Sequence, residues 1–137
     1  MVLVDSSVWI EGLRRNGSLE VKLALEGLLD VYEAQLCDPV RLEVLGGARK
    51  SERKKLSACF ALLPFRACTH EDWALAMEIS WKLRDAGVTV PWMDVLIAAI
   101  GLRESTRVYS VDKHFVLMSE TLGLLLYQPG YGGMYQD

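Results

Sequence analysis

One stretch of this sequence restricts the possible fold more than any other. Residues 91–102 (PWMDVLIAAIGL) form a helix-like segment that is apolar on nearly every face and carries one charge, Asp94. A helix that is hydrophobic all round must be buried, because no face of it suits water. No apolar run in the chain approaches the roughly 18–20 residues needed to cross a membrane. We therefore expect this helix in the core of a layered domain that has no membrane partner.

The composition is that of one globular domain. Hydrophobic residues make up 51% of the 137 positions and charged residues 24%, which allows a sizeable core and argues against disorder. Three cysteines form no C-x-x-C pair, so we expect neither a disulfide framework nor a zinc site, and a reducing cytoplasm is favoured. The first residues lack the basic segment of a signal peptide. With a net charge of −3, the chain needs a local basic patch or a metal ion to meet a nucleic acid.

Short β-like runs alternate with amphipathic helical stretches along the chain. This order predicts an α/β domain with a central, mostly parallel sheet of about five strands flanked by helices. We expect residues 1–128 to form this single domain, and residues 129–137, rich in Gly and Tyr, to form an irregular tail. The expected strands are residues 2–4, 32–36, 64–67, 107–110 and 124–127.

Capping residues and helix breakers divide the rest of the chain into helices. Ser6 or Ser7 is expected to cap the first helix, Asp38 the third, and a capping box at Thr69 and Asp72 the fifth. Glycines and Pro91 mark other ends and starts. The expected helices are residues 6–15, 18–29, 38–48, 50–62, 70–86, 92–104 and 113–122.

Large apolar side chains at helical spacing are interpreted as core. We expect the four tryptophans to pack inside the domain; they are Trp9, Trp73, Trp81 and Trp92. If Trp9 or Trp92 is exposed, its ring could instead stack on a nucleic-acid base. The first two helices carry stripes that are also expected to be buried. These stripes are Trp9, Ile10 and Leu13 in the first helix and Leu19, Leu23 and Leu28 in the second.

Three carboxylates each admit two interpretations. Asp5 follows a buried strand, at the sheet edge where ligands bind in open α/β domains, but a helix cap is equally compatible. Asp112 also follows a strand and heads a helix, so by itself it predicts an N-cap. Glu43 lies within a helix and by itself predicts a solvated side chain. Gly46 and Gly47, one turn later, would let another backbone or a substrate strand approach that face.

Asp94 is harder to explain by structure alone. A buried carboxylate without a partner costs several kcal/mol or becomes protonated. In the first turn of a helix, the helix dipole stabilises a negative charge by only about 0.3–1 kcal/mol. We therefore expect a bound cation or a buried Arg or Lys beside Asp94, unless that first turn forms an exposed corner.

Together the four acids predict a metal site. Those that follow strands would meet at the carboxyl edge of a parallel sheet, with Glu43 on a helix beside it. Clustered carboxylates repel one another unless a multivalent cation lies among them. A set of oxygen donors that requires no Cys or His suits Mg²⁺ or Mn²⁺, and such sites usually serve phosphate chemistry.

Four segments of the chain carry a family likeness. They are VLVDSSVWIE from residue 2, the helical Glu43, DVLIAA from residue 94 and SVDKHF from residue 110. In this order they resemble the PIN domain, and most closely the VapC toxins of bacterial and archaeal type II toxin–antitoxin pairs. The resemblance implies a Rossmann-like sheet and a metal-dependent endoribonuclease that cleaves RNA with a metal-activated water. By position, Asp5, Glu43, Asp94 and Asp112 would be its catalytic and metal-binding acids.

The resemblance also implies roles for other parts of the chain. Ser7 matches a small hydroxyl residue that can hydrogen-bond at the site. His114 stands where many relatives carry a further Asp, and Ser110 stands where Thr is common. The first two helices would form a groove for a cognate antitoxin and take part in homodimer contacts.

Residues 49–55 (RKSERKK) carry five basic side chains against one acid. The run predicts either a solvated helix face or a contact to RNA phosphates beside the acidic site. Arg14, Arg15 and Arg41 could join such a contact. Within the run, the candidate substrate-binding residues are Arg49, Lys50, Arg53, Lys54 and Lys55.

Other functions remain open at this point. One is a PIN-like RNA-processing nuclease outside any toxin–antitoxin pair, and another is a non-catalytic acidic metal-binding module. A receiver-like module fits poorly, because Ser6 stands where a second acid would follow Asp5. The two histidines show no triad or metal spacing. His70 is expected at the surface, and His114 in a structural role or near substrate.

Overall fold

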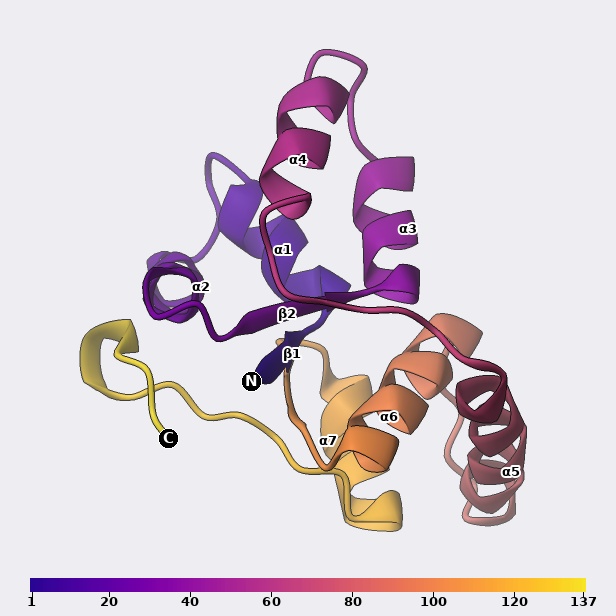
Figure 1. The fold of residues 1–137 in the computed structure, drawn as a ribbon. Helices are drawn as coiled ribbons and strands as arrows, with labels where there is room; N and C mark the ends of the chain where they lie inside the picture. Colours follow the sequence, from indigo (N-terminus) through magenta and orange to yellow (C-terminus); the bar gives the residue numbers. More distant parts are fainter.

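A parallel sheet of four strands forms the centre of the molecule. The computed structural model describes all residues 1–137 (Figure 1). The strands have the order β3-β2-β1-β4, so β1 lies between β2 and β4. Val2 of β1 pairs with Ala34 of β2 and with Arg107 of β4. The strand bounds are β1 (Val2–Val4), β2 (Ala34–Cys37), β3 (Phe65–Arg66) and β4 (Arg107–Tyr109).

The expected fifth strand is reduced to one parallel bridge, between Val108 and Leu126. The backbone beside β4 makes only two ladder bonds there, from Val108 N–H to the Leu125 carbonyl and from Tyr127 N–H to the Val108 carbonyl. The segment is short because Gly123, in the left-handed region, has just ended the preceding helix, and Pro129 follows soon after. The mostly parallel α/β fold is confirmed, with four strands in place of about five.

Seven helices surround the sheet. In Figure 1, helices α1, α3 and α4 lie above the strands, and α6 and α7 lie below them. Helix α5 packs on α6. No helix has the length and the apolar character needed to span a bilayer. The bounds are α1 (Ser6–Leu13), α2 (Leu19–Asp30), α3 (Asp38–Gly46), α4 (Arg53–Phe60), α5 (His70–Asp85), α6 (Trp92–Glu104) and α7 (Lys113–Leu122), with a 3-10 turn η1 (Tyr131–Gly133).

Two of the expected helix caps are wrong by one residue. Asp5, not Ser6 or Ser7, caps α1 by accepting the backbone N–H of Ser7. Asp38 is the first residue of α3, and its side chain accepts the backbone N–H of Cys68 at 2.7 Å. Asp38 is thus drawn away from its own helix by the segment that follows β3. The capping box at Thr69 and Asp72 is confirmed.

The core contains the helix that the sequence singles out. In α6, the residues from Asp94 to Gly101 are all buried, and the three residues of β1 are fully buried. The expectation that the tryptophans form core holds for Trp9 and is wrong for Trp73, Trp81 and Trp92, which are 51%, 67% and 77% exposed. Helix α5 buries a different stripe, which consists of Asp72, Ala76, Ile79 and Leu83.

The first two helices are also less buried than expected. Trp9 and Leu28 are buried, whereas Ile10, Leu13, Leu19 and Leu23 are exposed. Ile10 and Leu13 face a groove between α1 and the α3–α4 region. Leu19 and Leu23 lie beside the last residues of the chain. Each stripe is therefore divided, with one residue in the core and two at a surface depression.

The tail is held against α2 and β4. The backbone of Gly133 approaches Leu23 and Gly27 so closely that a Cβ on Gly27 would lie 2.3 Å from the Gly133 carbonyl oxygen. Arg107, at the start of β4, donates to the carbonyl of Gln136 at 2.8 Å. The Arg107 guanidinium also lies over the rings of two tyrosines, which stack on one another. These are Tyr127 and Tyr135.

Candidate metal centre

Asp5 is both a helix cap and a member of the acidic cluster. The side chain follows β1 directly, is only 3% exposed and caps α1. Its Oδ2 accepts hydrogen bonds from the hydroxyls of Ser7 (2.6 Å) and Ser110 (2.9 Å) and from the Ser7 backbone N–H (3.3 Å). These donors fix the orientation of the carboxylate and leave Oδ1 without a protein donor. The two sequence interpretations of Asp5 are therefore compatible.

Ser7 and Ser110 connect the start of α1 with the loop after β4. Their hydroxyls are 3.1 Å apart. The Ser7 hydroxyl accepts the backbone N–H of Val111 (3.2 Å), and the Ser110 hydroxyl accepts that of Asp112 (3.0 Å). These contacts hold the β4–α7 loop beside Asp5. The structure thus places Ser7 behind the carboxylate, as a residue that orients it.

Glu43 comes from α3 and completes one group of acids. Its Oε1 accepts a hydrogen bond from the hydroxyl of Ser6 at 2.8 Å. Carboxylate oxygens of Asp5, Glu43 and Asp94 lie within 4.8 Å of one another. The contact between Ser6 and Glu43 was not predicted from the sequence. The Asp-Ser-Ser run was the available signal, but which distant side chain it meets is decided by the fold.

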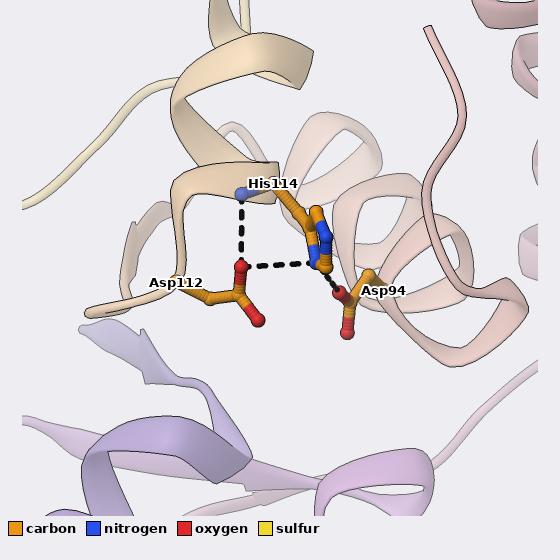
Figure 2. A group of neighbouring side chains, drawn as sticks. All are labelled: Asp94, Asp112 and His114. Atoms are coloured by element: carbon orange, nitrogen blue, oxygen red, sulfur yellow. Dashed lines mark hydrogen bonds and ion pairs between the residues drawn. The ribbon is translucent and has the colours of Figure 1, made fainter.

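Asp94 and Asp112 meet at the ring of His114, as Figure 2 shows. The Nδ1 atom of His114 lies 3.0 Å from Asp94 Oδ2 and 2.9 Å from Asp112 Oδ1. Asp112 also caps α7, because the same oxygen accepts the backbone N–H of His114 at 3.0 Å. Asp94 is 8% exposed, so an exposed corner is excluded. Its partner is this imidazole and not a buried Arg or Lys.

The acids impose a strong electrostatic effect on Asp94. Burial and the negative charge of Asp5 raise the pKa of the Asp94 carboxyl to about 6, with smaller contributions from Asp112 and Glu43. The hydrogen bond with His114 opposes this rise only in part. No ion pair joins any of the four acids to a lysine or arginine. The donor set and its uncompensated charge therefore fit a divalent cation.

The predicted basic run lies at the α3–α4 connection. Arg49 and Lys50 are exposed in the loop, and Arg53, Lys54 and Lys55 are exposed on the first turn of α4. Arg49 is 3.7 Å from Glu52, a loose surface pair that leaves the guanidinium accessible.

A groove runs between α1 and the α3–α4 region. It has a volume of about 550 Å³ and is lined by Ile10, Leu13, Val44 and Leu56 together with Arg14, Arg15 and Arg49. Ser6 and Glu43 belong to the metal centre, and Ile10 on α1 and Gly47 at the end of α3, each one helical turn later, line the groove, so the two adjoin. Arg41 lies elsewhere, over the ring of Phe65 and 3.8 Å from Asp38. His70 begins α5 and is exposed, as expected.

Comparison with known proteins identifies the fold family. The family model for the PIN domain matches residues 2–120. The chain belongs to the PIN domain family. The parallel sheet and the neighbouring acids agree with this family.

Individual relatives agree with this family. The chain is 30% identical over 129 residues to VapC ribonuclease Mb1587 of Mycobacterium bovis and to ribonuclease VapC11 of Mycobacterium tuberculosis. In each case the match covers 90% of this chain and 96% of the relative. This likeness places the chain with the VapC group of PIN domains.

Solved structures show the same fold at lower identity. FitAcB from Neisseria gonorrhoeae has a TM-score of 0.74 at 19% identity, and covers 93% of this chain and 97% of its own. VapBC2 from Rickettsia felis, bound to a DNA fragment from its promoter, has a TM-score of 0.74 at 15% identity and covers 93% and 98%.

Proposed function

We propose that this PIN-domain chain is a Mg²⁺- or Mn²⁺-dependent endoribonuclease and the toxin of a type II toxin–antitoxin pair in the cytoplasm. One observation carries the proposal. Asp5, Glu43, Asp94 and Asp112 converge at the carboxyl edge of the sheet, with no lysine or arginine to neutralise them. Its relatives at 30% identity carry the name VapC ribonuclease, which supports the same activity.

The chain's own residues would prepare this site for phosphodiester hydrolysis. Asp5 and Asp94 would hold the ion, with Glu43 and Asp112 beside them. A divalent ion bound there supplies charge that polarises a phosphoryl group and lowers the pKa of a bound water. Ser110 and the two serines after Asp5 keep the carboxylates oriented, so less reorganisation is needed when substrate arrives.

The basic side chains would bind the RNA backbone. Arg14, Arg15 and Arg49 line the groove beside the metal centre, and Lys54 and Lys55 extend the positive charge along α4. Contacts of this kind position a nucleic acid without reading its sequence. We propose Ser7 as an indirect contributor, because its hydroxyl is used within the protein.

The groove also suits an antitoxin segment. Ile10 and Leu13 are half exposed there, opposite Val44 and Leu56, and an apolar side chain from a partner would cover them. A cationic residue at the end of such a segment could reach the acidic cluster, because the groove and the cluster share α1 and α3. Structural neighbours include VapBC2 from Rickettsia felis and a toxin–antitoxin complex from Klebsiella pneumoniae.

We further propose that two copies pair through α5. Trp73, Met77 and Trp81 form an exposed stripe at a spacing of four residues, and contiguous exposed apolar patches commonly mark interfaces. An antiparallel crossing of two α5 helices would join the two stripes about a two-fold axis. This differs from the first two helices, where the family resemblance placed the dimer contacts.

RNA cleavage by the purified protein tests the nuclease proposal. The wild type should cut a mixed single-stranded RNA in Mg²⁺ or Mn²⁺, and EDTA should stop the cleavage. Asp5→Asn should lose activity by on the order of a hundredfold or more, because it removes a metal ligand. Asp30→Asn, at an exposed position outside the cluster, is the matched control and should remain active. Equal cleavage by the wild type and Asp5→Asn would contradict the proposal.

Expression in cells tests the toxin–antitoxin part separately. Expression of the chain alone should stop growth and create new RNA ends, and expression together with the neighbouring reading frame should prevent both effects. A nuclease that is active in vitro but harmless in cells, with or without that frame, would instead favour an RNA-processing enzyme outside a toxin–antitoxin pair.

A further inference from the structure

We propose that His114 is itself a ligand of the divalent ion, and that its imidazole shifts the site's preference from Mg²⁺ toward Mn²⁺. The inference rests on the proposed metal-dependent function and deepens it. It concerns position 114, where this sequence has a histidine and many members of the PIN family have an aspartate.

The geometry places one ring nitrogen of His114 between two carboxylates. Nδ1 lies 3.0 Å from Asp94 Oδ2 and 2.9 Å from Asp112 Oδ1, and single ligand atoms from all three side chains lie within 4.8 Å of one another (Figure 2). The backbone N–H of His114 donates to the same Asp112 oxygen. His114 therefore lies in the first turn of α7, where the hydrogen bond from its backbone keeps the imidazole beside Asp112.

If His114 had only a structural role, the two carboxylate oxygens beside Nδ1 would not both receive a full hydrogen bond. Nδ1 carries at most one hydrogen in either protonation state of imidazole, so it must share that hydrogen between two carboxylate oxygens. No lysine or arginine forms an ion pair with Asp94 or Asp112. A cation among the three atoms would instead interact favourably with each of them.

The nitrogen donor has a consequence for the choice of ion. Mg²⁺ takes oxygen ligands almost exclusively and keeps much of its water, whereas imidazole suits first-row transition metals. An aspartate at position 114 would have added a third carboxylate. His114 instead adds a nitrogen donor, which favours Mn²⁺ over Mg²⁺, and removes one negative charge, which lowers the affinity for both ions. The group formed by Asp5, Glu43 and Asp94 keeps oxygen donors only.

Pulsed EPR of the Mn²⁺-loaded, tag-free protein tests ligation without any activity measurement. The chain has two histidines, so the variant His70→Asn leaves His114 as the only imidazole. We expect ¹⁴N modulation of the Mn²⁺ signal in the wild type and in His70→Asn. The modulation should change to the ¹⁵N pattern when His70→Asn is labelled with ¹⁵N-histidine. This arm needs no substitution at the site and so does not depend on whether a His114 variant folds.

Calorimetric binding of each ion tests the preference. His114→Asp should tighten Mg²⁺ binding relative to Mn²⁺ by at least the roughly tenfold typical of residues around a metal, while His70→Asn should leave the ratio unchanged. Bound Mn²⁺ without ¹⁴N modulation, or an unchanged ratio in His114→Asp, would overturn the inference and leave the nuclease proposal standing. No Mn²⁺ binding by the wild type, together with no RNA cleavage in either ion, would remove both.

Discussion

Two buried aspartates show opposite ways of accommodating a negative charge. Asp72 is fully buried, and although burial opposes ionisation, hydrogen bonds from Arg66, Thr69 and Arg103 outweigh it and hold the pKa of Asp72 well below its usual range. Asp94 has no Lys or Arg partner and contacts only the imidazole of His114, and its pKa is raised. Asp72 therefore stabilises the fold, whereas the charge of Asp94 destabilises the metal-free fold and forms part of the candidate binding site.

Replacing Asp94 should stabilise the metal-free protein. The folded pKa of about 6 lies above the ordinary value near 3.9, so the wild type should lose stability as pH rises between these values. The loss should be on the order of 3 kcal/mol. In EDTA, Asp94→Asn should flatten this pH dependence and raise the melting temperature at pH 7. Added Mn²⁺ should raise the melting temperature of the wild type and not that of the variant. A lower melting temperature for Asp94→Asn in EDTA would contradict this account.

Replacing Asp72 should have the opposite effect. Asp72→Asn should reduce the free energy of unfolding by about 3 kcal/mol, because it leaves Arg66 and Arg103 facing a neutral group. Since the folded pKa is lowered, the stabilisation is present above the ordinary pKa near 3.9 and is lost as pH falls further. Urea denaturation from pH 7 to pH 3 measures both effects. The control is Glu104→Gln, a more exposed partner of Arg66, which should change stability by less than about 1 kcal/mol.

At the scale of elements, sequence signals located most helices and strands but not the faces they bury. Pro91, the Thr69 capping box and the Asp112 cap fixed three helix starts correctly. In α5, however, Trp73, Met77 and Trp81 have the spacing of a core stripe, and so do Ala76, Ile79 and Leu83. Helical periodicity cannot choose between two such stripes; the larger side chains were assigned to the core and proved exposed.

The candidate site, too, could be predicted from the sequence only in part. The acids that follow strands could be placed from the sequence, because parallel strands end at one edge of a sheet. The contact between Ser6 and Glu43, and the position of His114 between two acids, depend on how α3, α6 and α7 pack together. The contacts of Ser6 with Glu43 and of His114 with Asp94 span 37 and 20 residues of sequence and leave no local pattern to detect.

The contact between α2 and the tail offers a test at this scale. In Gly27→Ala, the new Cβ would lie 2.3 Å from the Gly133 carbonyl oxygen, so the 3-10 turn must move away from α2. We expect faster chymotrypsin cleavage at the tail tyrosines. Gly46→Ala adds a Cβ that lies 4.0 Å from Leu42 Cδ1, an ordinary van der Waals contact, and should leave the cleavage rate unchanged. An unchanged rate in Gly27→Ala would show that the tail does not depend on this close approach.

The whole molecule presents two apolar surfaces with separate proposed occupants, the groove beside α1 for an antitoxin and the α5 stripe for a second copy. Met77→Lys should shift the protein from dimer to monomer in analytical ultracentrifugation, because it places a charge at the centre of the stripe, where it would also meet its symmetry mate. The control is Leu62→Lys, at a leucine that is 72% exposed outside α5. It should not change the sedimentation, and both variants should still bind Mn²⁺. A Met77→Lys protein that remains dimeric would place the interface elsewhere.

The attachment of the tail to Arg107 has a practical consequence. Arg107 begins β4 and pairs with Val2, whereas Tyr109, at the other end of the strand, leads into Ser110 and the acids. Both ends of the polypeptide therefore leave from the edge of the sheet opposite the metal centre. A fluorescent protein fused after Asp137 would project from that edge and leave the metal centre accessible.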